Sequence, residues 1–260
     1  MHEIIVVDNA SSDSSLKILN EFGDKIKVIA NKENVGFGRA NNQAVKEAIS
    51  PFIFLLNPDT QLQHEGDLSE IVQFSKDHPQ YGLVGTRIIK TDGKTETIPK
   101  KYYPGEKHIG FPFKNLPGNI AWLLGACMMI PRNIYINLNG FDEDYFLYAE
   151  DIDLCLRIRK LGHEIGYLEA VAIIHVGGAS EKATKKYELT MKKQRALYKF
   201  YNKFYKRGAI RHLVTVDLKR AKFRKLFHKL RLKLGLKASH AKLDHYQAVY
   251  DSSKNFLDLL

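Results

Sequence analysis

The sequence has little cysteine and no long apolar segment. Cys127 and Cys155 are the only cysteines among its 260 residues, which is too few for a disulfide scaffold and favours a reducing compartment with two core thiols. No run approaches the roughly 18 apolar residues that a membrane span needs. Glu3 and Asp8 interrupt the short apolar stretch after Met1, so we expect no secretory signal peptide.

The last third of the sequence is poor in acidic residues. Residues 181–260 contain 22 Lys and Arg but only six Asp and Glu, a net charge of +16, whereas residues 1–180 have a net charge of −5. We therefore expect a globular domain over residues 1–180 and a basic helical extension over residues 181–260. A strongly basic surface favours an anionic partner, which leaves a membrane surface, a nucleic acid or a polyanionic glycan open.

Apolar runs and amphipathic segments alternate through the first 90 residues. The apolar runs predict strands at residues 4–7, 26–30, 52–56 and 81–89. Helical spacing of apolar residues predicts helices at 14–22, 39–49 and 67–76. Beyond a Pro- and Gly-rich loop, the same reasoning predicts strands at 121–130, 165–167 and 170–175 and a helix at 150–161. This alternation predicts an α/β fold with a mostly parallel sheet flanked by helices.

Polar residues follow two of the predicted strands at their carboxyl ends. Asp8 follows IIVV, and Asn57 and Asp59 follow FIFLL in the segment LLNPDT. Ligands of an open parallel sheet bind beyond the carboxyl ends of its strands, so these side chains lie where a ligand is expected. Carboxylate and amide oxygens suit a hard divalent cation, but Asn-Pro-Asp is also a common turn, and the residues alone leave both interpretations open.

Acidic residues are dense in GFDEDYFLYAEDIDLCLR, residues 140–157. Glu150 and Asp151 begin the predicted helix, and four aromatic residues lie close before them in the sequence. Acids in the first turn stabilise a helix through capping and its dipole. Carboxylates among aromatic side chains are also partly desolvated, which raises their pKa and suits a general base. Both interpretations stay open at this point.

Two further motifs suit a metal or phosphate contact. His175 ends the apolar strand in IIHVGG, a place typical of such a contact, although a lone histidine is more often a core residue. Gly36 and Gly38 precede a helix in NVGFGRANN, so backbone N–H groups and Arg39 are available to a phosphate. The third glycine of the dinucleotide-binding fingerprint is missing.

Six of these segments, in this order, resemble the family 2 glycosyltransferases: VVDNASSD, NVGFGRANN, LLNPDT, GACMMIPR, GFDEDYFLYAEDIDLCLR and HVGG. The resemblance is strongest to the rhamnosyltransferase-like enzymes of bacterial surface-polysaccharide synthesis, and it runs from residue 3 to about residue 180. It implies a GT-A fold and inverting sugar transfer from a nucleoside-diphosphate donor, a UDP- or dTDP-sugar, to a glycan or lipid-linked acceptor. It also implies Mg²⁺ or Mn²⁺ as the cofactor.

The resemblance assigns roles residue by residue. It implies that Asp8 reads the nucleobase and that four more residues lie on the donor side: Asn9, Asn34, Arg39 and Asn57. Asn57 stands where the family has the first acid of its Asp-x-Asp metal motif, so Asp59 is implied as the main metal contact, with His175 as the second.

The same resemblance implies a catalytic pair and an acceptor pocket. Asp151 matches the base that deprotonates the acceptor hydroxyl, with Glu150 beside it. Trp122, Gly125 and Ala126 match the segment that lines the pocket for the sugar and the acceptor.

Members of this family begin with one more strand and a helix before the segment that matches residues 3–8. We expect this strand, which pairs beside residues 4–7, to be missing from the chain, and transfer to be weak or absent without it. A wrongly assigned start, a gene remnant and a chain completed by another segment all fit. A sheet without a central strand has unpaired backbone groups and exposed apolar surface.

Residues 199–237 combine 14 Lys and Arg with a single acid, Asp217. Interleaved with them are apolar residues: Leu213, Val216, Leu218, Phe223, Leu226, Phe227, Leu230, Leu232 and Leu234. This pattern favours a basic amphipathic helix on an anionic membrane. The resemblance implies lipid-linked acceptors at the cytoplasmic face, and hence a cytoplasmic protein at the inner face of the cell membrane. A solvated basic helix packed on the domain is the alternative. Nucleic-acid binding is less favoured because no known motif is present.

Two functions of different class therefore remain. One is a glycosyltransferase of surface-polysaccharide synthesis. The other is a catalytically impaired remnant that acts as a basic membrane- or RNA-binding protein. Stabilisation by nucleotides favours the first, and salt-sensitive RNA binding without a nucleotide effect favours the second.

Overall fold

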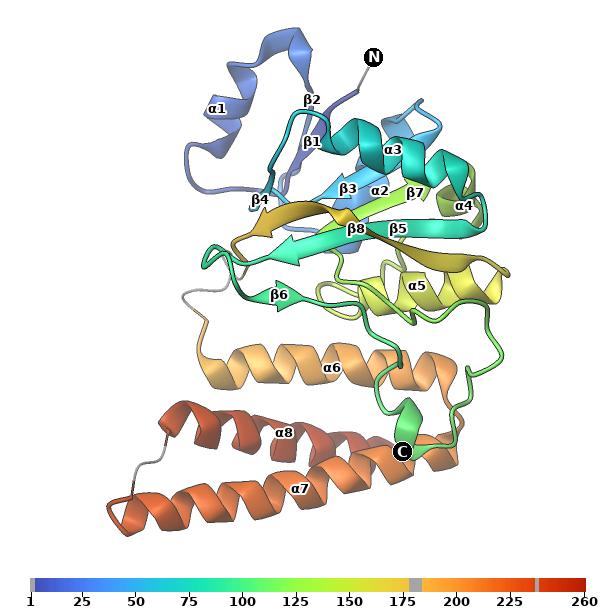
Figure 1. Ribbon diagram of the computed structural model, residues 1–260. Helices are drawn as coiled ribbons and strands as arrows, with labels where there is room; N and C mark the ends of the chain where they lie inside the picture. The colour runs from blue at the N-terminus through green and yellow to red at the C-terminus, as the bar shows by residue number, and fades with distance from the viewer. Residues whose placement is uncertain (1–2, 178–183, 237–238) are drawn as a thin grey trace. The chain divides into compact units, whose positions relative to one another are not determined.

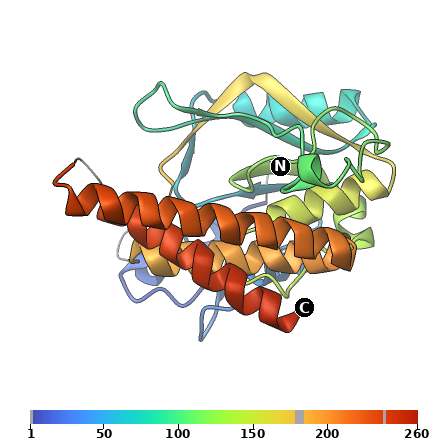
Figure 2. The ribbon, with the colours of Figure 1, turned by 90° about the horizontal axis from the view of Figure 1, so that it is seen from below.

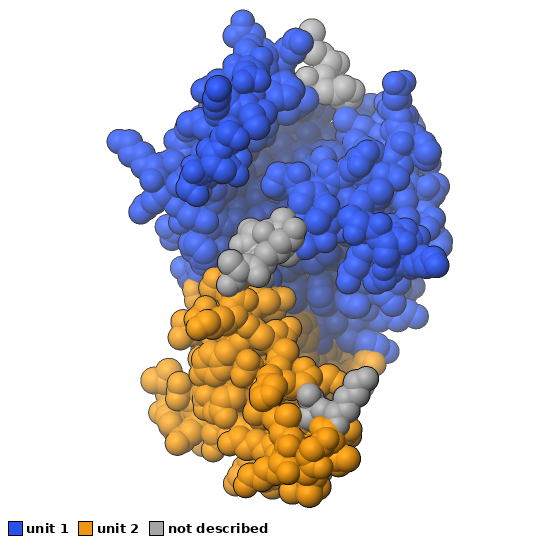
Figure 3. Space-filling view, turned by 90° about the vertical axis from the view of Figure 1, so that its left-hand side faces the viewer, with its two compact units in different colours: residues 1–103, 115–177 blue, residues 104–114, 178–260 orange. Residues whose placement is uncertain are grey.

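The computed structural model describes residues 3–177, 184–236 and 239–260. The chain forms two compact units, unit 1 with residues 1–103 and 115–177, and unit 2 with residues 104–114 and 178–260 (Figure 3). The boundary that the sequence predicts after residue 180, and the second glycine of HVGG, lie outside the described residues. That boundary stays a prediction.

Unit 1 is an α/β unit whose described residues form two sheets. The larger sheet contains β3 (Phe52–Leu56), β4 (Thr60–Leu62), β5 (Tyr81–Ile89), β6 (Glu96–Thr97), β7 (Cys127–Pro131) and β8 (Glu164–His175). Its strand order is β3-β7-β5-β8-β4, with β6 paired to β5 outside this row. The smaller sheet pairs β1 (Ile5–Asp8) with β2 (Lys27–Ala30).

Strand direction corrects one part of the predicted fold. β5 and β8 pair in parallel, as do β1 and β2. β7, however, runs antiparallel to both of its neighbours, β3 and β5, and β4 runs antiparallel to β8. The larger sheet is therefore mixed rather than mostly parallel, because β7 is reached through a long loop and not through the crossover helix that a parallel neighbour requires. The α/β class, with helices against a central sheet, is confirmed.

β1 and β3 are among the strands of unit 1 that pair on one side only within the described part of the chain. β1 pairs with β2, and β3 pairs with β7. Ile5, Val6 and Val7 of β1 are half-buried, although they form a continuous apolar run. The expected absence of a further strand beside residues 4–7 stays a prediction.

Helices cover both faces of the larger sheet. They are α2 (Phe37–Glu47), α3 (Asp67–Asp77), α4 (Arg132–Asn137) and α5 (Glu150–Lys160), and α1 (Ser15–Asn20) precedes β2. Leu83 of β5 packs with Leu154 and Ile158 of α5, whereas the adjacent Val84 packs with Ile71 of α3. Successive strand residues point to opposite faces, so α3 and α5 lie on opposite sides of the sheet (Figure 1).

Several predicted elements need new boundaries. α5 ends within one residue of the predicted helix, but the strand predicted at 121–130 begins only at Cys127. The strands predicted at 165–167 and 170–175 are one strand, β8, whose pairing with β5 shifts register between Thr86 and Arg87. Cys127 and Cys155 are free and buried, so the prediction of two core thiols is confirmed.

Unit 2 consists mainly of helices, as predicted for the extension. They are α6 (Lys186–Phe204), α7 (Arg207–Lys233) and α8 (His240–Leu259), with a 3₁₀ turn at Glu106–His108 (Figure 2). Tyr198 of α6 stacks on Phe256 of α8 at 4.4 Å and shares a 2.8 Å hydrogen bond with Ser253. Tyr205 donates a 2.6 Å hydrogen bond to the Pro104 carbonyl, which attaches residues 104–114 to the helices. Within the described residues, no helix is both long enough and apolar enough to cross a membrane.

Candidate active site

Asp59 and His175 lie side by side at one corner of the larger sheet. Asp59 directly precedes β4, whose first residue, Thr60, pairs with His175 of β8. This register holds the His175 Nε2 3.2 Å from one carboxylate oxygen of Asp59. The other carboxylate oxygen accepts a 3.0 Å hydrogen bond from the Gly177 N–H. The two residues predicted as metal contacts are thus brought together.

Asn9 joins the end of β1 to the NVGFG loop. Its amide donates hydrogen bonds to the Asn34 Oδ1 at 3.0 Å and to the Gly36 carbonyl at 3.3 Å, and its oxygen accepts one from the Val35 N–H at 3.0 Å. Asp8, the preceding residue, is buried at the carboxyl end of β1. The side chain of Asn9 therefore fixes Asn34 and the NVGFG loop beside the end of β1, where Asp8 lies.

Arg39 lies where α2 meets the acidic loop at residues 142–149. Its Nε donates to the Glu143 carbonyl at 3.3 Å and lies 3.6 Å from the Glu143 carboxylate, and both side chains are half-exposed. Gly36 has a φ of +92°, and a Cβ there would come within 2.6 Å of the Phe146 carbonyl oxygen. That carbonyl accepts a 2.9 Å hydrogen bond from the Phe37 N–H. Glycine at position 36 thus permits close packing of the acidic loop on the start of α2.

Asp151 is buried in the first turn of α5 and is held by backbone groups. Its two carboxylate oxygens accept hydrogen bonds from the N–H of Gly125 at 3.1 Å and of Ile152 at 2.8 Å. Ala126 follows Gly125 in the chain, and its carbonyl accepts a 3.0 Å hydrogen bond from the Asn57 N–H. The predicted base, part of the predicted acceptor pocket and the LLNPDT turn therefore form one continuous series of contacts.

Glu150 forms a buried acidic pair with Asp151. Burial, followed by the charge of Asp151, raises the pKa of Glu150 to about 8. Burial also raises the pKa of Asp151, although the N–H groups of Ile152 and Gly125 oppose this. One carboxylate oxygen of Glu150 has no hydrogen-bond partner in the described part of the chain. Two adjacent buried carboxyls resist ionising together, so the pair keeps a proton near neutral pH, which suits proton transfer.

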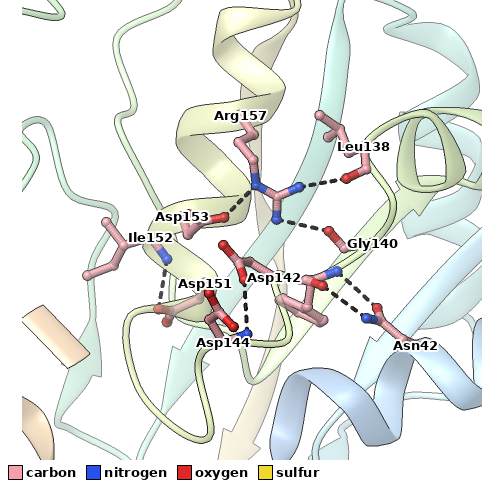
Figure 4. A network of polar contacts seen from close by, with 10 residues as sticks. Asn42, Leu138, Gly140, Asp142, Asp144, Asp151, Ile152, Asp153 and Arg157 are labelled. Atoms are coloured by element: carbon pink, nitrogen blue, oxygen red, sulfur yellow. Dashed lines mark hydrogen bonds and ion pairs between the residues drawn. The ribbon is translucent and has the colours of Figure 1, made fainter. Parts of the chain in front are cut away.

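Asp153, the third acid of this turn, has a structural role instead. It is fully buried and pairs with Arg157 one turn later on α5. The Arg157 guanidinium also donates 2.9 Å hydrogen bonds to the carbonyls of Leu138 and Gly140 (Figure 4). Arg157 therefore connects α5 to the start of the acidic loop. The spacing of four residues between an acid and an arginine on a helix was the available sequence signal for this pair.

Asn42 of α2 holds the same loop from the other side. It is buried, and its side chain hydrogen-bonds both the N–H and the carbonyl of Phe141 at 2.9 Å (Figure 4). At the far end of the loop, Tyr148 and Ala149 have φ values of +74° and +64°. Non-glycine residues rarely adopt this conformation, so the loop enters α5 through a strained turn directly before Glu150. Asn42 is the last residue of the NVGFGRANN segment, but nothing in the sequence predicted this contact.

Trp122 lies on the segment that leads to Gly125 and is half-buried. Its backbone pairs with Lys100 in an isolated bridge, and its indole N–H donates a 3.2 Å hydrogen bond to the Tyr102 carbonyl. Its ring packs against the core cluster that contains Leu123. The contacts of Trp122 position this segment, and its role in an acceptor pocket stays a prediction.

Asp59 and His175 offer two of the ligands that a divalent cation needs. Carboxylate oxygen and imidazole nitrogen suit Mn²⁺, and Mg²⁺ in nucleotide sites commonly binds through one or two carboxylates plus phosphate oxygens and water. Within residues 3–177, 184–236 and 239–260, no group of three or more His, Cys, Asp or Glu could hold a metal. The pair thus fits a cation shared with a bound diphosphate, not a closed protein cage. An open hollow lies beside Asp59 and does not reach Asp8 or Asp151. The other residues that line it are Pro58, Thr60, Gln61, Thr91, Ile174 and Val176.

A mixed α/β sheet with polar residues at its strand ends, next to a buried acidic pair, is consistent with a sugar-nucleotide transferase. The family model of glycosyl transferase family 2 matches residues 2–139, more than half of the chain. The chain therefore belongs to glycosyl transferase family 2. A second model, described as the N-terminal domain of galactosyltransferase, matches residues 105–178.

Curated relatives include two rhamnosyltransferases. The N-acetylglucosaminyl-diphospho-decaprenol L-rhamnosyltransferase of Mycobacterium tuberculosis H37Rv is 23% identical over 204 residues, which cover 66% of this chain and 66% of the relative. The rhamnosyltransferase WbbL of Escherichia coli K12 is 29% identical over 161 residues, which cover 54% of this chain and 60% of the relative. The chain spans about two thirds or less of the length of these relatives. The expected rhamnosyltransferase-like membership is confirmed.

Two of the solved structures that share the fold of this chain contain a bound nucleotide or nucleotide sugar. The mannosyltransferase PcManGT of Pyrobaculum calidifontis, solved with GDP-Man and Mn²⁺, has a TM-score of 0.58 at 14% identity, covering 98% of this chain and 78% of its own. TarS 1–349 of S. aureus, solved with UDP, has a TM-score of 0.53 at 16% identity, covering 99% of this chain and 82% of its own. At these identities the likeness shows the fold alone, and it confirms the expected GT-A type.

Proposed function

We propose that this protein is an inverting, metal-dependent glycosyltransferase that uses a UDP- or dTDP-sugar in the synthesis of a cell-surface polysaccharide. The observation that carries the proposal is the continuous contact from the LLNPDT turn through Ala126 and Gly125 to Asp151. It joins a corner suited to a diphosphate to a buried carboxylate suited to a base. Rhamnose is the first donor sugar to test, because two of the relatives are named as rhamnosyltransferases.

The donor side of the proposed site extends from Asp8 to Asp59. Asp8 would accept a hydrogen bond from the nucleobase, and Asn9 keeps Asn34 and the NVGFG loop in place beside it. Asp59 and His175 would hold Mg²⁺ or Mn²⁺, which supplies positive charge to the diphosphate when bound. Arg39 would contribute a second positive charge to the same region.

The catalytic step falls to Asp151. An acceptor hydroxyl is a weak nucleophile at neutral pH, and Asp151 would take its proton as the oxygen attacks the anomeric carbon. The raised pKa of Asp151 makes its carboxylate a stronger base than an exposed aspartate. Attack from the side opposite the nucleoside diphosphate inverts the configuration at the anomeric carbon.

The acceptor is proposed to be a glycan or a lipid-linked sugar. The name of the mycobacterial relative includes such an acceptor, a sugar diphosphate on decaprenol. An acceptor of this kind would place the protein in the cytoplasm at the inner face of the cell membrane. The impaired remnant is the second candidate, and nucleotide binding distinguishes the two.

A thermal-shift titration of the full chain with UDP and dTDP, with and without Mn²⁺, tests the proposal. A ligand that binds only the folded state adds about 2.7 kcal/mol of stability at a hundredfold excess over its Kd. We expect a nucleotide-dependent shift that grows with Mn²⁺ and is lost in Asp59→Asn. A folded protein that shows no shift with either nucleotide would support the impaired remnant.

A further inference from the structure

One face of α7 in unit 2 is apolar and exposed. Phe223, Leu226, Phe227, Leu230 and Leu234 follow one another at helical spacing, and their side chains are 42% to 67% exposed. At 3.6 residues per turn these positions form a single row along the C-terminal half of the helix, which we call the α7 stripe. An exposed apolar row of this length on a helix marks an interaction surface.

The α7 stripe lies opposite the face of α7 that packs on α8. Ala221 and His228, on the packed face, are buried, and the His228 ring stacks on Tyr246 of α8 at 5.6 Å. Lys225 on the same face lies 3.8 Å above the Tyr250 ring. α7 therefore packs on α8 through the face opposite the stripe. The stripe takes no part in this packing and is exposed to an external partner.

Basic residues border the stripe on both sides. Arg220 and Arg224 follow one border, and Lys222, Lys229 and Lys233 follow the other, all of them exposed. Apolar side chains between two rows of cations match the boundary of an anionic bilayer, where the apolar row enters the acyl region and the cations meet headgroup phosphates. A nucleic-acid surface would use the cations but not the five apolar side chains.

We propose that the α7 stripe inserts into the headgroup boundary of an anionic membrane and holds the protein there. The structure also corrects the extent of the predicted segment at 199–237. Leu213 is buried in unit 2, and Val216 and Leu218 are half-buried, so the N-terminal half of α7 belongs to the unit's own packing. The stripe supplies the membrane contact that the proposed function needs for a lipid-linked acceptor, but lipid binding itself does not depend on transferase activity.

Vesicle flotation with the full chain tests this inference. Vesicles of phosphatidylcholine alone are compared with vesicles that contain phosphatidylglycerol, at low and high salt and without nucleotide. We expect binding to the anionic vesicles only, weakened by salt because the cations contribute. The Leu226→Ser/Leu230→Ser variant should lose roughly tenfold or more in binding, because each apolar side chain gains free energy on leaving water.

A matched control comes from α8 of the same unit. Leu259 is 84% exposed but lies outside the stripe, so Leu259→Ser should bind vesicles like the unchanged protein. Circular dichroism shows whether each variant stays folded. As a second readout, Phe227→Trp keeps the stripe apolar and should give a blue-shifted emission with anionic vesicles but not with neutral ones.

Three results would overturn the inference. Equal vesicle binding by the stripe variant and the Leu259 control would show that the stripe does not contact the membrane. Salt-sensitive RNA binding without vesicle binding would assign the cations to a nucleic acid. A dimer that the stripe variant abolishes, again without vesicle binding, would assign the stripe to a second copy of the chain. A nucleotide-induced thermal shift in the same protein would leave the proposed transferase function standing in each case.

Discussion

In unit 1 the candidate carboxylates are buried or half-buried and accept hydrogen bonds from backbone N–H groups, whereas in unit 2 the cations of α7 lie exposed beside the α7 stripe. Asp151 is fixed by Gly125 and Ile152, and Asp59 by Gly177. Each of these contacts depends on the fold of the surrounding chain. A membrane surface needs no such precision, since several cations and apolar side chains act together. We therefore expect single substitutions to act strongly in unit 1 and weakly in unit 2.

Asp151→Asn is expected to have the largest effect. General-base catalysis contributes about 10²- to 10⁴-fold to rate, and an amide cannot take the acceptor proton. The measurement is release of nucleoside diphosphate from a panel of UDP- and dTDP-sugars in the presence of acceptor. Asn keeps an oxygen that can accept the Gly125 N–H, so folding and nucleotide binding should change little. A variant with unchanged turnover would exclude Asp151 as the base.

Arg157→Met is expected to affect stability most. It leaves Asp153 buried without its arginine, and breaking a buried ion pair in this way costs about 3 to 5 kcal/mol. Urea unfolding measures the loss. The Arg157→Met/Asp153→Asn variant should recover part of it, because no unpaired charge remains. A loss below about 1 kcal/mol, as for an exposed ion pair, would show that the acidic loop does not depend on this contact.

The pH dependence of stability should reveal the acidic pair. The pKa of Glu150 is raised to about 8 in the folded protein, above its ordinary value of 4.5. The folded state therefore holds a proton that the unfolded state releases, so this contribution to stability is fully present below about pH 4.5 and is lost as the pH rises to about 8. Urea midpoints between pH 5 and 8 should fall less steeply in Glu150→Gln. Parallel pH profiles for the two proteins would contradict the raised pKa.

Arg39→Ala should have the smallest effect on stability. Its ion pair with Glu143 is half-exposed, and such pairs contribute about 0 to 1 kcal/mol. If Arg39 meets the diphosphate, nucleotide affinity should nevertheless fall, and Lys27→Ala, which removes another exposed ion pair, should leave affinity unchanged. Equal nucleotide affinity in both variants would show that Arg39 does not contact the bound nucleotide.

The resemblance predicted that Asp59 and His175 lie together, which the structure shows, whereas the roles of the site residues stay predictions. The sheet was predicted less well. Strand direction depends on how distant segments pair, and neither β4 nor the reversal of β7 has a local signal. Short strands are fixed by pairing rather than by their own residues, which is why β4 was missed. The turn at residues 91–94, by contrast, has a hairpin signal, and β5 and β6 pair across it.

The contacts that position the acidic loop, and the buried face of α7, could not be predicted from the sequence either. Asn42 hydrogen-bonds the backbone of Phe141, almost a hundred residues away, and the NVGFGRANN segment that contains Asn42 does not indicate this contact. In α7 the apolar residues interleaved with Lys and Arg were recognised, but helical spacing alone did not separate the buried Leu213 from the exposed Leu230. The packing of α7 on its neighbours in unit 2, which include Gly105 beside Leu213, decides which face is outside.

Titration of two variants with UDP and dTDP in the presence of Mn²⁺ tests the central claim most directly. In the proposed site, Asp59 belongs to the donor corner and Asp151 is the base. We expect Asp151→Asn to bind nucleotide like the unchanged protein but not to transfer sugar, and Asp59→Asn to lose metal-dependent binding. Loss of nucleotide binding in Asp151→Asn together with full binding in Asp59→Asn, both variants being folded, would contradict it.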